Sequence, residues 1–292
     1  MPRSDNLRGA AIMLVAVGSF SVMDAGLKIL SPHYSPMQVA ALRGLSTLPL
    51  ALAYVVLHGG LGQLLRVRFG IHLLRGVLGI SSLVTFTYGL RALGLSETYA
   101  IFFVAPVLIT VFAALWLREH IGRRRWIIIG LGFVGTLIVL RPTGRGTLTL
   151  SGLAILSTAV TYAASAITTR VLGKTDSTQS MVFWLVAMVA VGAGLLALPE
   201  WRPIQRGHWP AIGLIAAGGS VGQWGITEAF KRGEASFIAP LEYTALLWGV
   251  GFDWFLWHTL PGPVTLLGAG IIIACGVVLV RSERVHAEAE HP

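Results

Sequence analysis

The sequence predicts an all-α, polytopic membrane protein with ten transmembrane helices arranged as two inverted five-helix repeats. Three observations lead to this fold class: an apolar composition, a regular succession of long apolar segments, and an internal similarity between the two halves. Of the 292 residues, 54% are hydrophobic and only 12% are charged, and the mean hydropathy is +0.74. A soluble domain carries about 25% charged residues because its surface faces water. We therefore expect lipid around most of this chain.

The charge distribution and the cysteine content exclude several classes of function. The net charge is +9, but the basic residues lie between apolar segments rather than along one polar face, so no nucleic-acid partner is expected. The single cysteine, Cys275, allows neither an intramolecular disulfide nor a cysteine-based metal cluster. The sequence lacks a His-Glu-x-x-His motif. An intramembrane enzyme is therefore only a remote alternative, and we expect no cofactor and no metal.

Ten apolar segments are long enough to cross a membrane, which requires about 20 mostly apolar residues each. Short connections with turn residues separate them, for example His58-Gly59-Gly60 and Pro261-Gly262-Pro263, and leave no room for a soluble domain. The predicted helices span residues 8–30, 36–57, 71–91, 97–117, 123–140, 150–172, 179–198, 209–230, 236–257 and 263–281.

Individual segments carry features that explain their ends and shapes. The first follows a basic stretch, Met1 to Arg8, but it is longer than the roughly 7–15 residues of a signal-peptide core and lacks a small-residue cleavage site. It is therefore expected to be a retained helix. Pro106 predicts a kink in the fourth segment because proline cannot donate a backbone hydrogen bond. The fifth segment begins with Arg123-Arg124-Arg125, a basic run typical of the cytoplasmic side of a membrane.

The distribution of Lys and Arg between the loops predicts the orientation of the chain. With the N-terminus inside, most basic residues lie on the cytoplasmic side, so both termini are expected in the cytoplasm. That side receives Arg3, Arg8, Arg66, Arg68, Arg75, Arg118, Arg123, Arg124, Arg125, Arg170, Lys174, Lys231, Arg232, Arg281 and Arg284. The opposite side receives Lys28, Arg91, Arg141, Arg145, Arg202 and Arg206, while Arg43 lies within a span.

The two halves of the chain resemble each other. Ala92 to Thr98 aligns with Ala229 to Ala235, and the Gly130/Gly132 pair aligns with Gly268 and Gly270 at nearly the same offset. Because each half holds an odd number of spans, the second half must enter the membrane upside down relative to the first. Such inverted repeats are typical of transporters that bind their substrate near the midplane. The predicted units are residues 1–145, residues 146–282 and a cytoplasmic tail, 283–292.

These motifs resemble those of the drug/metabolite transporter superfamily. An Ala-x-x-x-[Gly/Ser]-Glu-[Ala/Thr] turn opens the fourth and ninth spans, and Glu119 with Gly122 follows the fourth. Within the superfamily the chain is most similar to EamA-type bacterial metabolite exporters, of which aromatic amino acid exporters are a plausible match. It departs from the pattern in the second half, where the position matching Glu119 falls near Trp257 and carries no carboxylate. The resemblance implies efflux of small metabolites across the bacterial inner membrane through a central cavity.

The candidate substrate-binding residues are polar and aromatic side chains expected near the midplane. A mixed lining of this kind suits an amphiphilic solute, although the same residues could serve interhelical packing. They are Ser82, Thr85, Tyr99, Phe103, Tyr162, Ser165, Gln223, Trp224, Glu242 and Tyr243. Glu242 could bind a substrate ammonium group or a coupling proton, or could pair with a neighbouring helix.

Other charged residues within the spans need partners, because an isolated charge at the centre of a helix costs about 2.5–3.5 kcal/mol on insertion scales. Asp24 and Lys28, four residues apart, are predicted either to form a gate near the outer mouth or only to neutralise each other. Arg43 is expected to pair with Asp24 or to extend toward the interface. Glu97 and Glu234 are expected to cap their helices, since a carboxylate complements a helix N-terminus.

The functional prediction is a secondary transporter that exports small metabolites, in the first place aromatic or other apolar amino acids, by alternating access. The alternative is a transporter of a vitamin or nucleoside-like solute, with uptake as a further direction. The expected partners are a small-molecule substrate and the lipid bilayer. The sequence favours neither a monomer nor a homodimer.

Overall fold

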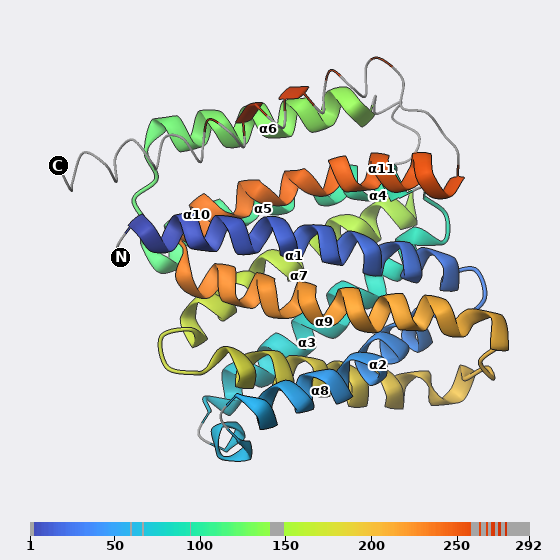
Figure 1. The fold of residues 1–292 in the computed structure, drawn as a ribbon. Helices are drawn as coiled ribbons and strands as arrows, with labels where there is room; N and C mark the ends of the chain where they lie inside the picture. Colours follow the sequence, from blue (N-terminus) through green and yellow to red (C-terminus); the bar gives the residue numbers. More distant parts are fainter. Residues whose placement is uncertain are drawn as a thin grey trace.

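The computed structural model describes residues 3–58, 60–65, 67–93, 95–140 and 149–257, and single positions between 263 and 278. This part of the chain is a bundle of helices (Figure 1), and the predicted all-helical fold class is confirmed. The long helices are α1 (Arg3–Leu30), α2 (Pro36–Leu57), α3 (Phe69–Leu90), α6 (Arg123–Leu140), α7 (Leu150–Leu172), α8 (Thr178–Ala197) and α9 (Trp209–Arg232). Most of the predicted tenth span and the predicted tail, 283–292, lie outside the described residues.

Five of the described helices are long and apolar enough to cross a membrane. They are Asn6–Leu30, Pro36–Leu57, Phe69–Leu90, Leu150–Leu172 and Thr178–Glu200. Their outward faces carry large apolar side chains that are strongly exposed, such as Leu57 at 78% and Leu195 at 63%. Exposed apolar surface of this extent is expected of a molecule surrounded by hydrocarbon.

Local sequence explains where several helices begin. Ser35, Thr149 and Ser177 occupy the N-cap positions of α2, α7 and α8, and each side-chain oxygen accepts a hydrogen bond from a backbone N–H of the first turn. Pro36 follows as the first residue of α2, where its missing N–H has no intrahelical partner to lose. These caps account for the close agreement between the predicted and observed starts of the three helices.

Helices of the first half pack mainly against helices of the second half. In Figure 1, α1 lies beside α9, α3 beside α7 and α2 beside α8. The first helix of each half thus contacts the third helix of the other, and the second helices contact each other, as a two-fold relation between the halves requires. Close approach depends on small residues: a Cβ atom on Gly44 would lie 2.5 Å from the backbone nitrogen of Ala190.

The predicted fourth and ninth spans are interrupted, and only the fourth, at Pro106, was expected to depart from a straight helix. The fourth consists of α4 (Leu95–Phe102), α5 (Ala105–Phe112) and a π-helical turn, η2 (Ala113–Leu117). The ninth consists of α10 (Ala235–Ile238), a 3₁₀ segment η5 (Ala239–Thr244) and α11 (Ala245–Trp257). Pro106 lies in the first turn of α5 and Pro240 in η5. Proline removes one backbone donor and crowds the preceding turn, so each interruption has a local cause.

The N-terminus of α10 is capped by a residue from the other half of the chain. Arg118 ends η2 in the left-handed conformation, with φ at 54°. Glu119 follows, and its carboxylate oxygens accept hydrogen bonds from the backbone N–H groups of Ala235 and Ser236, both at 3.1 Å. Glu234 was expected to provide this cap, but its side chain makes no capping bond. The side chain of Glu97 lies outside the described residues.

Candidate functional site

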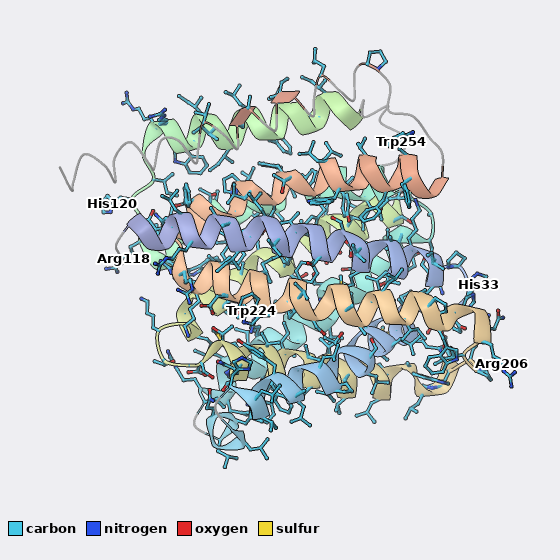
Figure 2. The ribbon with its side chains drawn as sticks, viewed as in Figure 1. His33, Arg118, His120, Arg206, Trp224 and Trp254 are labelled. Carbon is cyan, nitrogen blue, oxygen red and sulfur yellow. The ribbon has the colours of Figure 1, made fainter. Side chains whose placement is uncertain are left out.

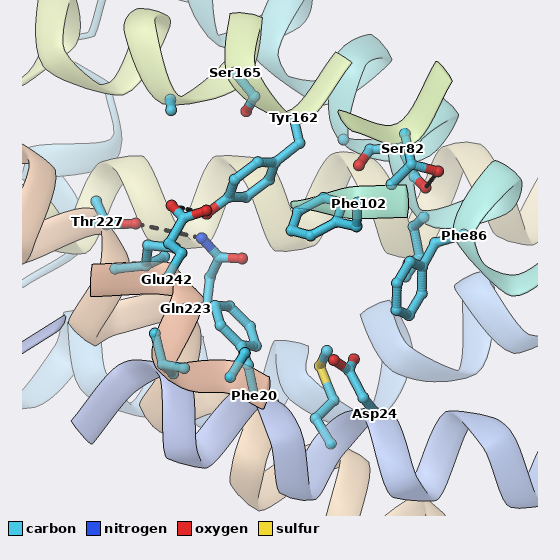
Figure 3. A pocket seen from close by; sticks show the side chains of 18 of the residues that line it. Phe20, Asp24, Ser82, Phe86, Phe102, Tyr162, Ser165, Gln223, Thr227 and Glu242 are labelled. Atoms are coloured by element: carbon cyan, nitrogen blue, oxygen red, sulfur yellow. Dashed lines mark hydrogen bonds between the residues drawn. The ribbon is translucent and has the colours of Figure 1, made fainter. Parts of the chain in front are cut away.

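A cavity of about 180 Å³ lies at the centre of the bundle. A single water needs roughly 10–15 Å³ measured in this way, so the space is large enough for a small organic solute. Its wall is formed by side chains from α1, α2, α3, α4, α7, α8, α9, η5 and α11, so both halves of the chain contribute (Figure 3). Charged residues such as Arg118 and Arg206 lie at the two ends of the bundle (Figure 2).

Most of the predicted substrate-binding residues meet in this wall. They are Ser82, Tyr99, Phe103, Tyr162, Ser165, Gln223 and Glu242. Asp24, predicted as half of a charge pair, also lines the cavity, whereas Lys28 lies one turn farther along α1 and outside the wall. Pro106 lies outside it as well, at the start of α5.

Three predicted residues lie outside the wall because they serve contacts between helices. Thr85 on α3 forms a hydrogen bond with Thr158 on α7, with an Oγ1–Oγ1 distance of 2.7 Å. The indole N–H of Trp224 donates to the hydroxyl of Tyr54 on α2 at 2.7 Å. Tyr243 is only 2% exposed and packs edge-on against the ring of Phe103.

Two buried carboxylates in the wall are each held by a tyrosine. The hydroxyl of Tyr99 on α4 donates to Asp24 Oδ2 on α1 at 2.8 Å. The hydroxyl of Tyr162 on α7 donates to Glu242 Oε1 on η5, also at 2.8 Å (Figure 3). Asp24 is 8% exposed and Glu242 only 3%. Both pairs cross between separate segments of the chain, so they position the carboxylates within the cavity.

Two arginines also line the cavity, and neither was among the predicted site residues. Arg43 on α2 donates to Gln223 Oε1 at 3.3 Å and lies over the ring of Phe20. Arg75 on α3 is 2% exposed and donates to the carbonyl oxygen of Met181 at 2.8 Å. A charge within an apolar span was the available signal in both cases. It was missed for Arg75 because this residue, near the start of its segment, was assigned to the cytoplasmic loops.

Aromatic rings form the apolar part of the wall. Phe102 on α4 packs against Tyr162 with a centroid distance of 5.2 Å, and against Phe86 on α3 at 6.3 Å. Figure 3 shows these rings and Phe20 around the open space, with Gln223 and Glu242 beside them. Rings and a few convergent polar groups together suit the binding of a flat, amphiphilic solute.

Hydrogen bonds close the bundle at the end where α1 begins, which we call the amino end. His72 Nε2 on α3 lies 2.8 Å from Asp176 Oδ2 in the α7–α8 loop, and the backbone N–H of Arg68 bonds the same oxygen. Burial raises the pKa of Asp176, but hydrogen bonds from Thr175, His72 and Arg68 outweigh this effect, so its pKa lies below the usual value. Asp176 is therefore ionised at neutral pH and links the two halves.

A separate set of contacts closes the opposite end, which we call the distal end. Gln38 on α2 exchanges two hydrogen bonds with the backbone of Arg202, at 2.6 and 3.0 Å. The hydroxyl of Tyr34 lies 2.8 Å from His208 Nδ1, and the guanidinium of Arg91 donates to the carbonyl oxygen of Tyr34 at 2.6 Å. Among the described residues, no group of three or more His, Cys, Asp or Glu side chains could hold a metal ion.

Comparison with known proteins matches this architecture. The model of the EamA-like transporter family fits residues 7–141 and 149–282, one copy in each half. The riboflavin transporter of Vibrio cholerae is 30% identical over 277 residues, covering 91% of each chain. The pseudopaline exporter CntI of Pseudomonas aeruginosa is 25% identical, covering 94% of this chain and 97% of the relative. The S-adenosylmethionine uptake transporter of Rickettsia prowazekii is 24% identical, covering 98% and 96%.

The fold also occurs in a solved crystal structure. That chain is 16% identical and superposes with a TM-score of 0.80, covering 95% of this chain and 98% of the other. At this level of identity the likeness concerns the fold alone.

Proposed function

The chain belongs to the EamA-like transporter family, and on this premise we propose that it carries a small heteroaromatic metabolite, of the vitamin or nucleoside kind, by alternating access through the central cavity. Family membership makes it a multi-pass membrane transporter of small metabolites rather than an enzyme. The identity of the solute and the route through the cavity are the proposal.

The chemistry of the cavity supports this class of solute. Phe86, Phe102 and Tyr162 provide faces on which a flat ring can stack. Gln223 and Ser165 provide hydrogen-bonding groups for the polar part of the same molecule. The aromatic wall with polar groups at its edge is the single observation that carries the proposal.

The relatives support the same class. Riboflavin and S-adenosylmethionine, which two relatives are named for, each combine a fused heteroaromatic ring with a polar chain. Export of aromatic amino acids, the first expectation from the sequence, has no specific support among these names. The relatives favour the alternative of a vitamin or nucleoside-like solute, and they include both uptake and export.

The arrangement of contacts supports alternating access. Separate sets of hydrogen bonds close the amino end and the distal end, so either set could open while the other holds. The interrupted segments contribute Phe102, Phe103 and Glu242 to the cavity wall, and in many carriers broken helices of this kind form the binding site around which one half moves against the other.

Counterflow in proteoliposomes tests the proposal. Vesicles loaded with unlabelled riboflavin, S-adenosylmethionine or phenylalanine are mixed with the same solute carrying a label, and accumulation of the label reports exchange. We expect exchange of at least one of the two heteroaromatic solutes, and its loss in Ser165→Trp, because the indole would fill the cavity.

A matched substitution on the same helix controls for folding. Val160 on α7 is 47% exposed on the outer face of the bundle, so Val160→Trp should exchange solute like the wild type. Exchange of phenylalanine alone would replace the proposed solute class with amino acids. Full activity of Ser165→Trp would show that the solute does not pass through this cavity.

A further inference from the structure

Glu242 is the most unusual ionisable group in the cavity wall. It lies in η5, the 3₁₀ segment that interrupts the ninth span, and is 3% exposed. Its Oε1 accepts a hydrogen bond from Tyr162, while its Oε2 is shielded from solvent and has no hydrogen-bond partner among the described residues. A buried carboxylate normally has both oxygens bonded, so this arrangement needs an explanation.

A bound proton accounts for this geometry. An ionised carboxylate at this depth, with one neutral partner and one bare oxygen, is strongly disfavoured, and such groups become neutral instead. Protonation removes the charge and leaves one hydrogen bond with Tyr162. A solute ammonium group is a poorer fit, because it would need direct access to Oε2, which the surrounding side chains cover.

The groups around Glu242 include a cation that can compensate its charge after the proton leaves. Arg75 lines the same cavity, and its Nε is also buried, with no hydrogen-bond partner in the part of the chain that the structure describes. Tyr162, the hydrogen-bond partner of Glu242, lines the same cavity as Arg75. Among the described side chains, the other charged or titratable groups that line this cavity are Asp24, Arg43, Arg75, Tyr99 and Tyr162, and Tyr243 with Cys275 lies beside Glu242.

We propose that Glu242 is a proton-binding site that couples solute movement to a proton gradient, with Arg75 as the cation that balances the ionised carboxylate. One proton binds the carboxylate while the cavity faces one side, and the same proton leaves when the cavity faces the other. This inference rests on the proposed function, because coupling requires a carried solute. Two consequences can be tested separately: Glu242 is protonated in the absence of solute, and the rate of solute transport depends on the pH gradient.

Gradient-driven flux tests the coupling. In proteoliposomes, net transport of labelled riboflavin or S-adenosylmethionine is measured with and without an imposed pH gradient, and divided by exchange in the same preparation. The ratio of net transport to exchange should rise with the gradient in the wild type, and Glu242→Gln should lose this response because glutamine binds no proton.

The control is Glu200→Gln, at an exposed carboxylate on the distal end, which should respond like the wild type. Wild-type exchange without any response to pH would overturn the coupling alone, leaving the proposed function intact.

Infrared spectroscopy tests the protonated state without any solute. At neutral pH the purified protein should show the carbonyl stretch of a protonated carboxylic acid, shifted in heavy water. Glu242→Gln should lack this band, whereas Asp24→Asn should retain it. Persistence of the whole band in Glu242→Gln, or its absence from the wild type, would overturn the inference even if transport is observed.

Discussion

At the scale of single residues, hydrogen bonds between segments that are distant in sequence position the polar groups of the cavity wall. Tyr99 and Asp24 are one example, and Tyr162 and Glu242 are another. Because each tyrosine fixes the position of a carboxylate, loss of either hydroxyl would remove the hydrogen bond that holds a buried acid, which is more unfavourable than losing an exposed hydrogen bond.

The capping carboxylate of Glu119 gives a prediction for stability. Glu119→Ala removes both hydrogen bonds to the first N–H groups of α10, and we expect a destabilisation of about 1 kcal/mol, the typical effect of losing an N-cap. The shift in thermal unfolding of the protein in detergent measures it. Glu200→Ala, an exposed carboxylate with no such role, serves as the control. An equal shift for both variants would contradict the capping role.

The lowered pKa of Asp176 gives a prediction for pH dependence. Since the folded state binds a proton on Asp176 more weakly than the unfolded chain does, the stabilisation is fully present above the usual pKa of about 3.9 and is lost as the pH falls through the lower folded value. Wild-type protein should therefore exceed Asp176→Asn in unfolding temperature at neutral pH, and the difference should shrink below about pH 4. A difference that is constant from neutral to acidic pH would argue against this contribution.

At the scale of helices, close packing between the halves depends on residues without side chains. Gly44 on α2 faces the backbone of Ala190 on α8, and Gly218 on α9 faces the carbonyl oxygen of Ser19 on α1. In lipid, where the hydrophobic effect does not drive helices together, such contacts supply much of the association.

Replacing Gly44 tests this packing. A methyl group in Gly44→Ala would meet backbone atoms that cannot move independently, and we expect a destabilisation of about 1–3 kcal/mol, as for overpacking elsewhere. Gly194→Ala on α8 is the matched control, because nothing lies within 4 Å of the added carbon. Its unfolding temperature in detergent should equal or slightly exceed that of the wild type. Equal tolerance of both changes would mean that α2 and α8 are less closely packed.

The sequence predicted where helices begin better than it predicted which side of each helix faces the cavity. Caps such as Ser35 and Ser177 mark helix starts by local hydrogen bonding, so they can be recognised without tertiary information. The neighbours Gln223 and Trp224 on α9 could not be distinguished in this way. They differ by about 100° around the helix axis, and only packing against α2 determines that Gln223 faces the cavity while Trp224 contacts Tyr54.

At the scale of the whole molecule, composition and repetition were sufficient to predict the fold, because hydrocarbon permits few spanning structures. Composition and repetition could not predict which residues line the cavity, because the cavity forms only where the two halves meet. Arg75 illustrates the limit: its position near the start of a span suggested a loop charge, whereas contacts with Met181 and Thr227 from the second half bury it.

Orientation in the membrane is a separate prediction. The excess of Lys and Arg in the loops at the amino end should place this end, and both termini, in the cytoplasm. Fusions of a reporter that is active only in the cytoplasm, made in turn at the N-terminus, the C-terminus and the distal loop near Arg206, would measure it. Activity at both termini and none at the distal loop is the expected pattern, and termini on opposite sides would contradict the two-repeat arrangement.

The most direct test of the account is the accessibility of the cavity from each side of the membrane. In a Cys275→Ser background, Ser165→Cys places a single thiol in the wall, and a membrane-impermeant thiol reagent is applied to right-side-out and to inside-out vesicles. We expect labelling from both sides, slowed in each case by a solute that the protein exchanges. Labelling from one side only, or labelling unaffected by every exchanged solute, would contradict transport through this cavity.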